Sequence, residues 1–114
     1  GAFAGRMIND CMDEFPREYF EPALKADKLR PSGRDPSVNR FGVDCGTSLE
    51  YWRSKGWIRR DPRGWFQWYC RYCLGRRDAQ EDLHQMKRWS AMARHARNTS
   101  PKGQQTLLHW AWPI

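Results

Sequence analysis

The chain has 114 residues, the length of one ordinary domain, and its formal net charge is +7. Hydrophobic residues make up 39% of it, and no stretch approaches the ~20 apolar residues of a membrane-spanning helix, so we expect no membrane partner. The first fifteen residues lack the apolar run of a secretory signal, and we therefore expect reduced thiols and an intracellular location, nuclear or cytoplasmic.

The N-terminal part of the chain predicts little regular structure. Short helical turns are expected over 15–19 and 21–26, around Pro16 and Pro22. Residues 28–46 are rich in proline and glycine and read as loop. We therefore expect one domain over 1–114, with a loop-rich part over 1–46 and a helical core over 47–114.

Helix signals become frequent after residue 46. Thr47 and Glu50 have the spacing of a capping box, and Gly56 can end the helix that follows. The Asp61-Pro62 pair then has the pattern of an N-cap followed by a first helical residue. A second helix is therefore expected over 62–74.

This second helix carries apolar side chains on most of its circumference, which is typical of a central element. We expect its aromatic residues Trp65, Phe66, Trp68 and Tyr69 to be largely buried. Gly75 follows directly and can end the helix.

Two further helices complete the expected core. Asp78 and Glu81 form another capping pattern, which opens a helix to about residue 97, and Ser100-Pro101 opens a last one to about residue 110. The inner stripe of the first of these is expected to be Leu83, Met86, Trp89, Ala93 and Ala96. No alternating run predicts a strand, so the expected fold is all-α, a small orthogonal helical bundle around the Trp-rich helix 62–74.

Several phrases of the sequence occur together in a recognisable order. They are residues 55–58 (KGWI), 61–71 (DPRGWFQWYCR), 74–77 (LGRR) and 105–110 (QTLLHW). In this order the chain resembles a family of small uncharacterised proteins that occurs widely in fungal and other genomes. The resemblance covers nearly the whole chain and implies no activity. Its members often carry an aromatic residue where this chain has Cys73, which implies that the pair Cys70 and Cys73 is not a shared feature of the family.

The residues that could carry chemistry form no complete motif. Cys70 and Cys73 have the C-x2-C spacing of zinc ligands, but the sequence contains no second such pair and no H-x3-5-H. We therefore expect buried thiols, no metal site and no cofactor. The histidines stand apart from one another, at positions His84, His95 and His109. With no nucleophile beside a base, we name no catalytic residues, and the sequence favours a protein that is not an enzyme without deciding the question.

The remaining signal is basic. Residues 53–102 contain thirteen Lys or Arg against four Asp or Glu, and guanidinium groups pair bidentately with phosphate. We expect a nucleic-acid-binding module, for DNA or RNA, that contacts phosphates with little sequence preference. Its expected contact residues are Trp57, Arg59, Arg60, Arg63, Arg76, Arg77, Lys87, Arg88, Arg94 and Arg97. Two alternatives stay open: an interaction or structural domain that binds an acidic protein surface, and an enzyme whose residues converge only in three dimensions.

Overall fold

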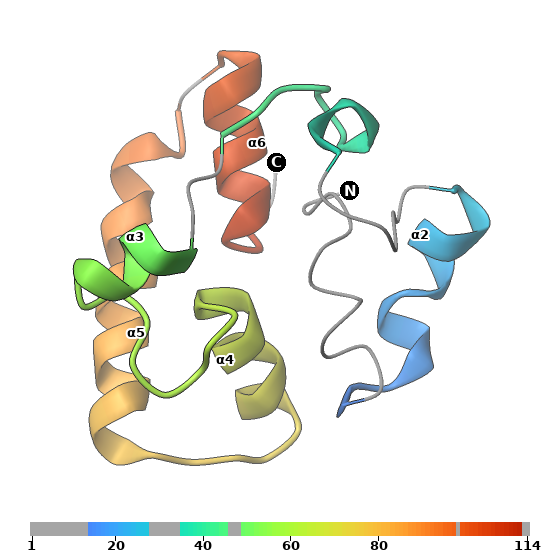
Figure 1. Ribbon diagram of the computed structural model, residues 1–114. Coiled ribbons are helices and arrows are strands. Elements are labelled where there is room, and N and C mark those ends of the chain that lie inside the picture. Colours follow the sequence, from blue (N-terminus) through green and yellow to red (C-terminus); the bar gives the residue numbers. More distant parts are fainter. Residues whose placement is uncertain (1–13, 28–34, 46–48, 98, 113–114) are drawn as a thin grey trace.

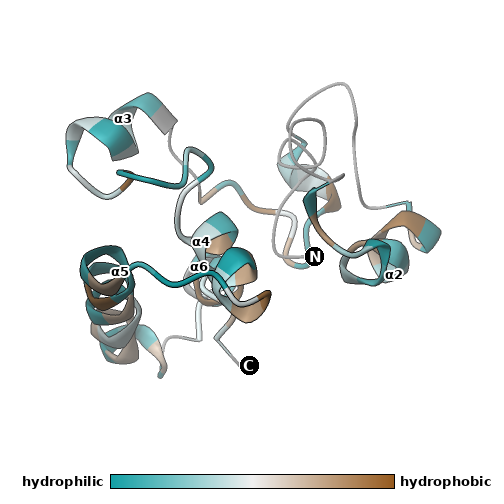
Figure 2. Ribbon diagram, turned by 90° about the horizontal axis from the view of Figure 1, so that it is seen from below, coloured by the Kyte–Doolittle hydropathy of each residue, from teal (hydrophilic) through white to brown (hydrophobic). Residues whose placement is uncertain are grey.

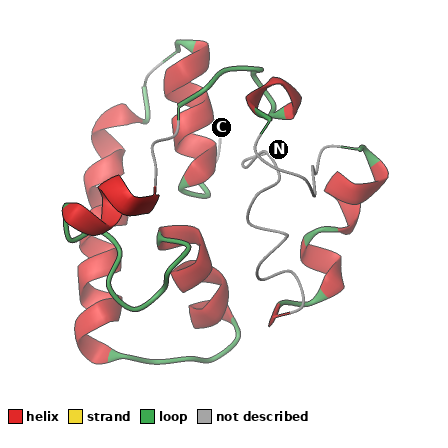
Figure 3. Ribbon diagram, viewed as in Figure 1, coloured by secondary structure: helices red, strands yellow, loops and turns green. Residues whose placement is uncertain are grey.

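The computed structural model describes residues 14–27, 35–45, 49–97 and 99–112. Within these ranges every regular element is helical and no strand occurs, which confirms the all-α prediction (Figure 3). The α-helices are α2 (Glu21–Lys25), α3 (Leu49–Ser54), α4 (Trp65–Cys73), α5 (Ala79–Ala91) and α6 (Pro101–His109). Shorter 3-10 turns are η2 (Arg17–Tyr19), η3 (Pro36–Val38) and η4 (Met92–His95).

The helices of the core are arranged in two directions. Figures 1 and 2 show α4, α5 and α6 running roughly along one axis, while α3 crosses them on one side. The turns η2 and α2 confirm the short helical segments expected there and lie on the opposite side of α4 from α5 (Figure 1). The crossing of α3 over the other helices leaves the space in which the candidate site lies.

The start of α4 differs from the prediction. The helix begins at Trp65, with Gly64 as N-cap, and not at Pro62. Asp61 does not cap it, because its carboxylate is buried and accepts hydrogen bonds from Arg71 Nη1 at 2.7 Å and Arg76 Nη2 at 2.8 Å. Two charge-assisted bonds of this kind are stronger than one bond to a helix amide.

The other helix boundaries follow the sequence more closely. The Asp78 carboxylate accepts a hydrogen bond from the Glu81 amide at 3.2 Å, and the Ser100 hydroxyl accepts one from the Gly103 amide at 3.1 Å. The reciprocal bond of the α5 capping box comes from Asp82 instead of Glu81, since Asp82 Oδ2 accepts from the Asp78 amide at 2.9 Å. Thr47, the other expected cap, lies outside the described residues.

Two glycines end helices as expected. Gly56 after α3 and Gly75 after α4 have φ angles of +72° and +106°, which side chains other than glycine rarely adopt. In each case the next amide bonds back across five residues, from Trp57 to the Trp52 carbonyl at 3.0 Å and from Arg76 to the Arg71 carbonyl at 3.1 Å. This is the Schellman arrangement, and it satisfies carbonyl groups that the helix end leaves open.

Tryptophan rings form the centre of the core. Trp65 and Trp68 are buried, and the Trp65 ring centroid lies 5.2 Å from that of Trp110, the residue directly after α6. Phe66 is half-buried, but Tyr69 is 39% exposed, so its expected burial was wrong. Tyr69 instead stacks on the outer side of Trp65, with ring centroids 5.0 Å apart.

The expected inner stripe of α5 was also wrong. Leu83 and Met86 are 54% and 40% exposed, while Glu81, Asp82 and Gln85 are buried. Ala93 and Ala96 are exposed too, Trp89 is half-buried, and Met92 is the buried apolar residue near this end. The polar face turns inward because each of its groups finds a partner there. Their bonds are Glu81 with Arg59, Asp82 with the Trp68 indole N–H at 2.9 Å, and Gln85 with Glu81 at 2.7 Å.

Candidate functional site

A pocket of about 380 Å³ opens between α3, the segment 57–64 and the other core helices. Its apolar walls are four tryptophans, two further apolar side chains and a tyrosine: Trp52, Trp57, Trp65, Trp110, Ile58, Phe66 and Tyr51. Its polar lining is Arg63, Arg88, Thr106, Cys45 and His109. The volume lies within the range of about 300–1,000 Å³ that is usual for small-molecule sites.

Arg88, on α5, supplies a cation to this pocket. Its Nη1 donates to the Trp57 carbonyl at 2.8 Å and to Gln85 Oε1 at 3.0 Å, and its guanidinium lies 5.4 Å and 4.9 Å from the ring centroids of Trp57 and Trp110. Burial lowers the pKa of Arg88 to about 10, so the group is still charged at neutral pH. Among the described residues no carboxylate lies within ion-pairing distance of it.

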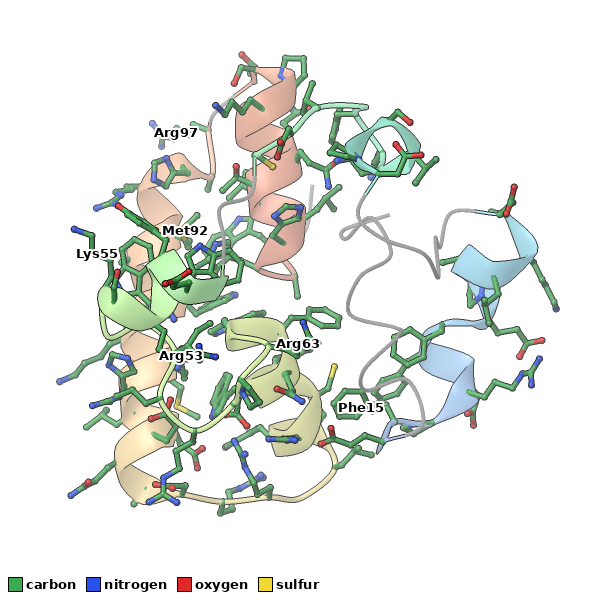
Figure 4. The ribbon with its side chains drawn as sticks, in the orientation of Figure 1. Phe15, Arg53, Lys55, Arg63, Met92 and Arg97 are labelled. Carbon is green, nitrogen blue, oxygen red and sulfur yellow. The ribbon has the colours of Figure 1, made fainter. Side chains whose placement is uncertain are left out.

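The beginning of α4 also faces the pocket. Gly64 and the first helical residues, Trp65 and Phe66, line it, and Figure 4 places Arg63 beside this first turn. Gly64 offers no side chain to cap the amides at the helix start. A carbon atom on Gly64 would lie 3.1 Å from the Trp52 ring, so glycine also allows α3 to approach closely. The helix start adds partial positive charge to that of the two arginines.

Cys45 and His109 meet in the same pocket, although 64 residues separate them. The sulfur of Cys45 lies 3.9 Å from both His109 Nδ1 and His109 Nε2. An atom equally distant from both nitrogens lies off the bonding direction of each, because these directions diverge in the ring plane. The pair is therefore not aligned for proton transfer in this arrangement.

Several of the basic residues expected to contact nucleic acid are engaged within the protein. Arg59 pairs with Glu81 at 3.3 Å and Arg60 with Asp78 at 2.9 Å. Arg76 is bound to Asp61, as described above. Arg77 lies with its guanidinium 3.6 Å from the Tyr72 ring centroid and donates to the Tyr72 carbonyl at 2.7 Å.

The rest of the expected set divides between two places. Trp57, Arg63 and Arg88 come together at the pocket. Three of the others are exposed: Lys87 on α5, Arg94 in η4 and Arg97 after η4. Arg94 Nε also donates to His95 at 3.0 Å. Arg76 and Arg77 lie beyond the other end of α5, which is roughly 20 Å long. The expected residues therefore do not gather at one point.

The cysteines and histidines give no metal-binding cluster within the described ranges. Of the two cysteines expected to be buried, Cys70 is buried, but Cys73 is exposed, so its expected burial was wrong. No helix in the described part of the chain is long and apolar enough to cross a membrane. Cys11 lies outside it.

Comparison of the chain with family models, with curated proteins and with solved structures returned no match. The functional argument therefore rests on the residues themselves. Sequence reasoning marked Trp57, Arg63 and Arg88 but missed Cys45 and His109 as neighbours, because no local spacing connects them.

Proposed function

We propose that the protein binds nucleic acid through exposed cations that contact phosphate groups. The observation that supports this proposal is the separation of charge between the inside and the outside of segment 53–102. All four carboxylates of this segment are buried or nearly so and are bound to partners inside the protein: Asp61, Asp78, Glu81 and Asp82. The exposed charges of the segment are therefore positive.

The exposed cations are spread over several elements. They include Arg53 and Lys55 at the end of α3, Lys87 on α5, Arg94 and Arg97 around η4, and Lys102 on α6. Arg59 and Arg60 belong to the same outer surface, since their side chains are 49% and 68% exposed although each pairs with a carboxylate. The Arg60–Asp78 pair lies near the surface, where ion pairs are weak, so a phosphate can compete for the Arg60 guanidinium. Arg59 is held by the buried Glu81 and offers a phosphate only the exposed part of its guanidinium.

Such a surface favours binding that depends on charge and not on base sequence. Each neutralised phosphate releases counterions, so affinity falls steeply as salt concentration rises. Among the described residues these cations are spread over several elements and do not form a row along one helix that could contact base edges. We therefore expect little sequence preference.

The test measures binding to random-sequence DNA and RNA, single- and double-stranded, by fluorescence anisotropy over a range of salt. The triple variant K87A/R94A/R97A should bind more weakly, and its log–log salt slope on single strands should be smaller by about 2, since each phosphate contact contributes about 0.7. A matched control is R17A/K25A/R40A, which removes the same charge from exposed positions outside segment 53–102. Equal slopes for both triple variants, or no binding at low salt, would contradict the proposal.

A second candidate is an adaptor domain that binds an acidic protein. It is favoured by the exposed pair Leu83 and Met86, which lie one turn apart on the outer face of α5 beside Lys87. A large apolar side chain beside a cation suits the contact surface of an acidic amphipathic helix. The substitutions L83S/M86S would weaken binding of such a partner without changing the salt slope for nucleic acid.

A further inference from the structure

The pocket under α3 plays no part in the charge-based binding proposed above. It is a site with aromatic walls, and its lining includes Trp57, Trp65 and Trp110 from three different segments. Aromatic rings of this kind bind planar ligands through stacked and edge-to-face contacts. The shape and lining of the pocket therefore favour a ligand with a flat, unsaturated ring.

Arg88 distinguishes this pocket from the other places where arginine is partly buried. Arg71 is paired with Glu14 and Asp61, and Arg76 with Asp61, so each guanidinium that is withdrawn from water there has a carboxylate. Arg88 forms no ion pair among the described residues: it donates to carbonyl oxygens and lies against two tryptophan rings. The Glu81 carboxylate attracts it from a distance but is bound by Arg59 and Gln85. A partly buried guanidinium without a carboxylate in direct contact is unfavourable, and a ligand acid would supply that contact.

Two further features add positive potential at the same place. The side chain of Arg63 lines the pocket, and α4 begins in its wall at Gly64, which has no side chain to act as a cap. The lining residues that the structure describes include no carboxylate. An acidic group would thus enter a pocket with largely apolar walls, where its attraction to the Arg88 guanidinium is strong.

We propose that this pocket binds a small ligand made of a planar aromatic ring and one acidic group, with the ring against the tryptophans and the acid on Arg88. Two sources share this chemistry: an aromatic carboxylate and a nucleoside monophosphate. A neutral or cationic ring lacks the partner for Arg88 and should bind poorly. This proposal does not depend on nucleic-acid binding by the outer surface.

The experiment titrates the full chain with three probes: 2-naphthoate, its neutral counterpart 2-naphthamide, and adenosine monophosphate. Binding is followed by the NMR signals of the tryptophan indole N–H groups, assigned by single Trp→Phe changes. We expect saturable shifts for Trp57, Trp65 and Trp110 with at least one of the two acids, and at least about tenfold weaker binding of the amide. Whichever acid shifts these signals identifies the source of the ligand.

Two variants locate the binding. R88Q should weaken binding of the acid at least about tenfold and leave the amide unchanged, whereas the control R94Q, on the exposed side of η4, should bind as the parent does. If R88Q fails to fold, T106F provides the test, because Thr106 lines the pocket and is only half-buried, so a ring there fills the space. Equal affinity for acid and amide, no saturable shift at millimolar concentration, or undiminished binding by T106F would each overturn the proposal.

Discussion

Asp61 shows how one side chain sets the course of the chain. Asp61 is only 1% exposed, which makes it one of the most buried charged side chains of the described residues. Its carboxylate accepts hydrogen bonds from the guanidinium groups of Arg71, near the end of α4, and of Arg76, just after α4. Arg71 also pairs with Glu14, and hydrogen bonding to that glutamate, opposed by burial, raises the pKa of Arg71 above its ordinary value. The carboxylate therefore joins the segment before α4 to the turn after it.

Replacing Asp61 by Asn keeps the shape of the side chain and removes its charge. We expect D61N to lower the free energy of unfolding by about 1.5–3 kcal/mol, the range for hydrogen bonds to charged groups. The measurement is urea denaturation at neutral pH. The control is E50Q, the same type of change at an exposed glutamate in the first turn of α3, which should have almost no effect. A loss no larger than that of the control would show that Asp61 has no structural role.

At the scale of an element, α5 shows why periodicity alone misplaced a face. Leu83, Met86 and Trp89 have helical spacing, and the sequence therefore predicted them inside. The structure buries the polar face of α5 instead, because other segments supply hydrogen-bond and ion-pair partners for it. These partners are Arg59, the Trp68 indole and the Trp57 carbonyl. Partners from distant segments leave no trace in local spacing. The caps at Asp78 and Ser100 were predictable because they depend only on residues three positions away.

This reversed face can be tested by exchanging polarity on α5. Q85L removes bonds to the Trp57 carbonyl, Glu81 and Arg88 from a buried position, so we expect a loss of about 1–3 kcal/mol in the free energy of unfolding. L83Q changes an exposed position and should cost less than about 0.5 kcal/mol. Thermal and urea denaturation of both variants give the comparison. If Q85L were more stable than the parent and L83Q were destabilised, the buried face of α5 would be the one that the sequence predicted.

For the whole molecule, charge is arranged by depth. In segment 53–102 the carboxylates lie inside and most of the cations lie outside, with Arg88 in the pocket as an exception. The composition alone shows only an excess of Lys and Arg. The pocket was beyond sequence reasoning for a similar reason. Its lining comes from separate stretches that include Cys45, Trp57, Arg88 and His109, and only the folded arrangement of the chain brings them together. Local pattern predicted the helices, whereas their relative placement needed the three-dimensional structure.

The N-terminal part is attached to this core by a contact that responds to pH. Arg71 on α4 donates to Glu14, and this hydrogen bond lowers the pKa of Glu14 from its ordinary value of 4.5, against the opposing effect of burial. A carboxylate with a lowered pKa in the folded state stabilises the fold above pH 4.5 and loses this contribution as the pH falls through the folded value. Gln67 strengthens the same attachment by donating to Glu14 at 3.2 Å.

We therefore expect E14Q to lower stability at neutral pH and to flatten the dependence of stability on pH below 4.5, because the variant has no proton to take up there. Urea denaturation at a series of pH values from neutral down to the acid range measures both effects. The matched control is E18Q on η2, an exposed glutamate with no ion pair among the described residues. Its pH profile should follow that of the parent protein. If the two variants have the same profile, Glu14 does not link the N-terminal part to α4, and the attachment rests on the buried rings Phe15 and Phe20 instead.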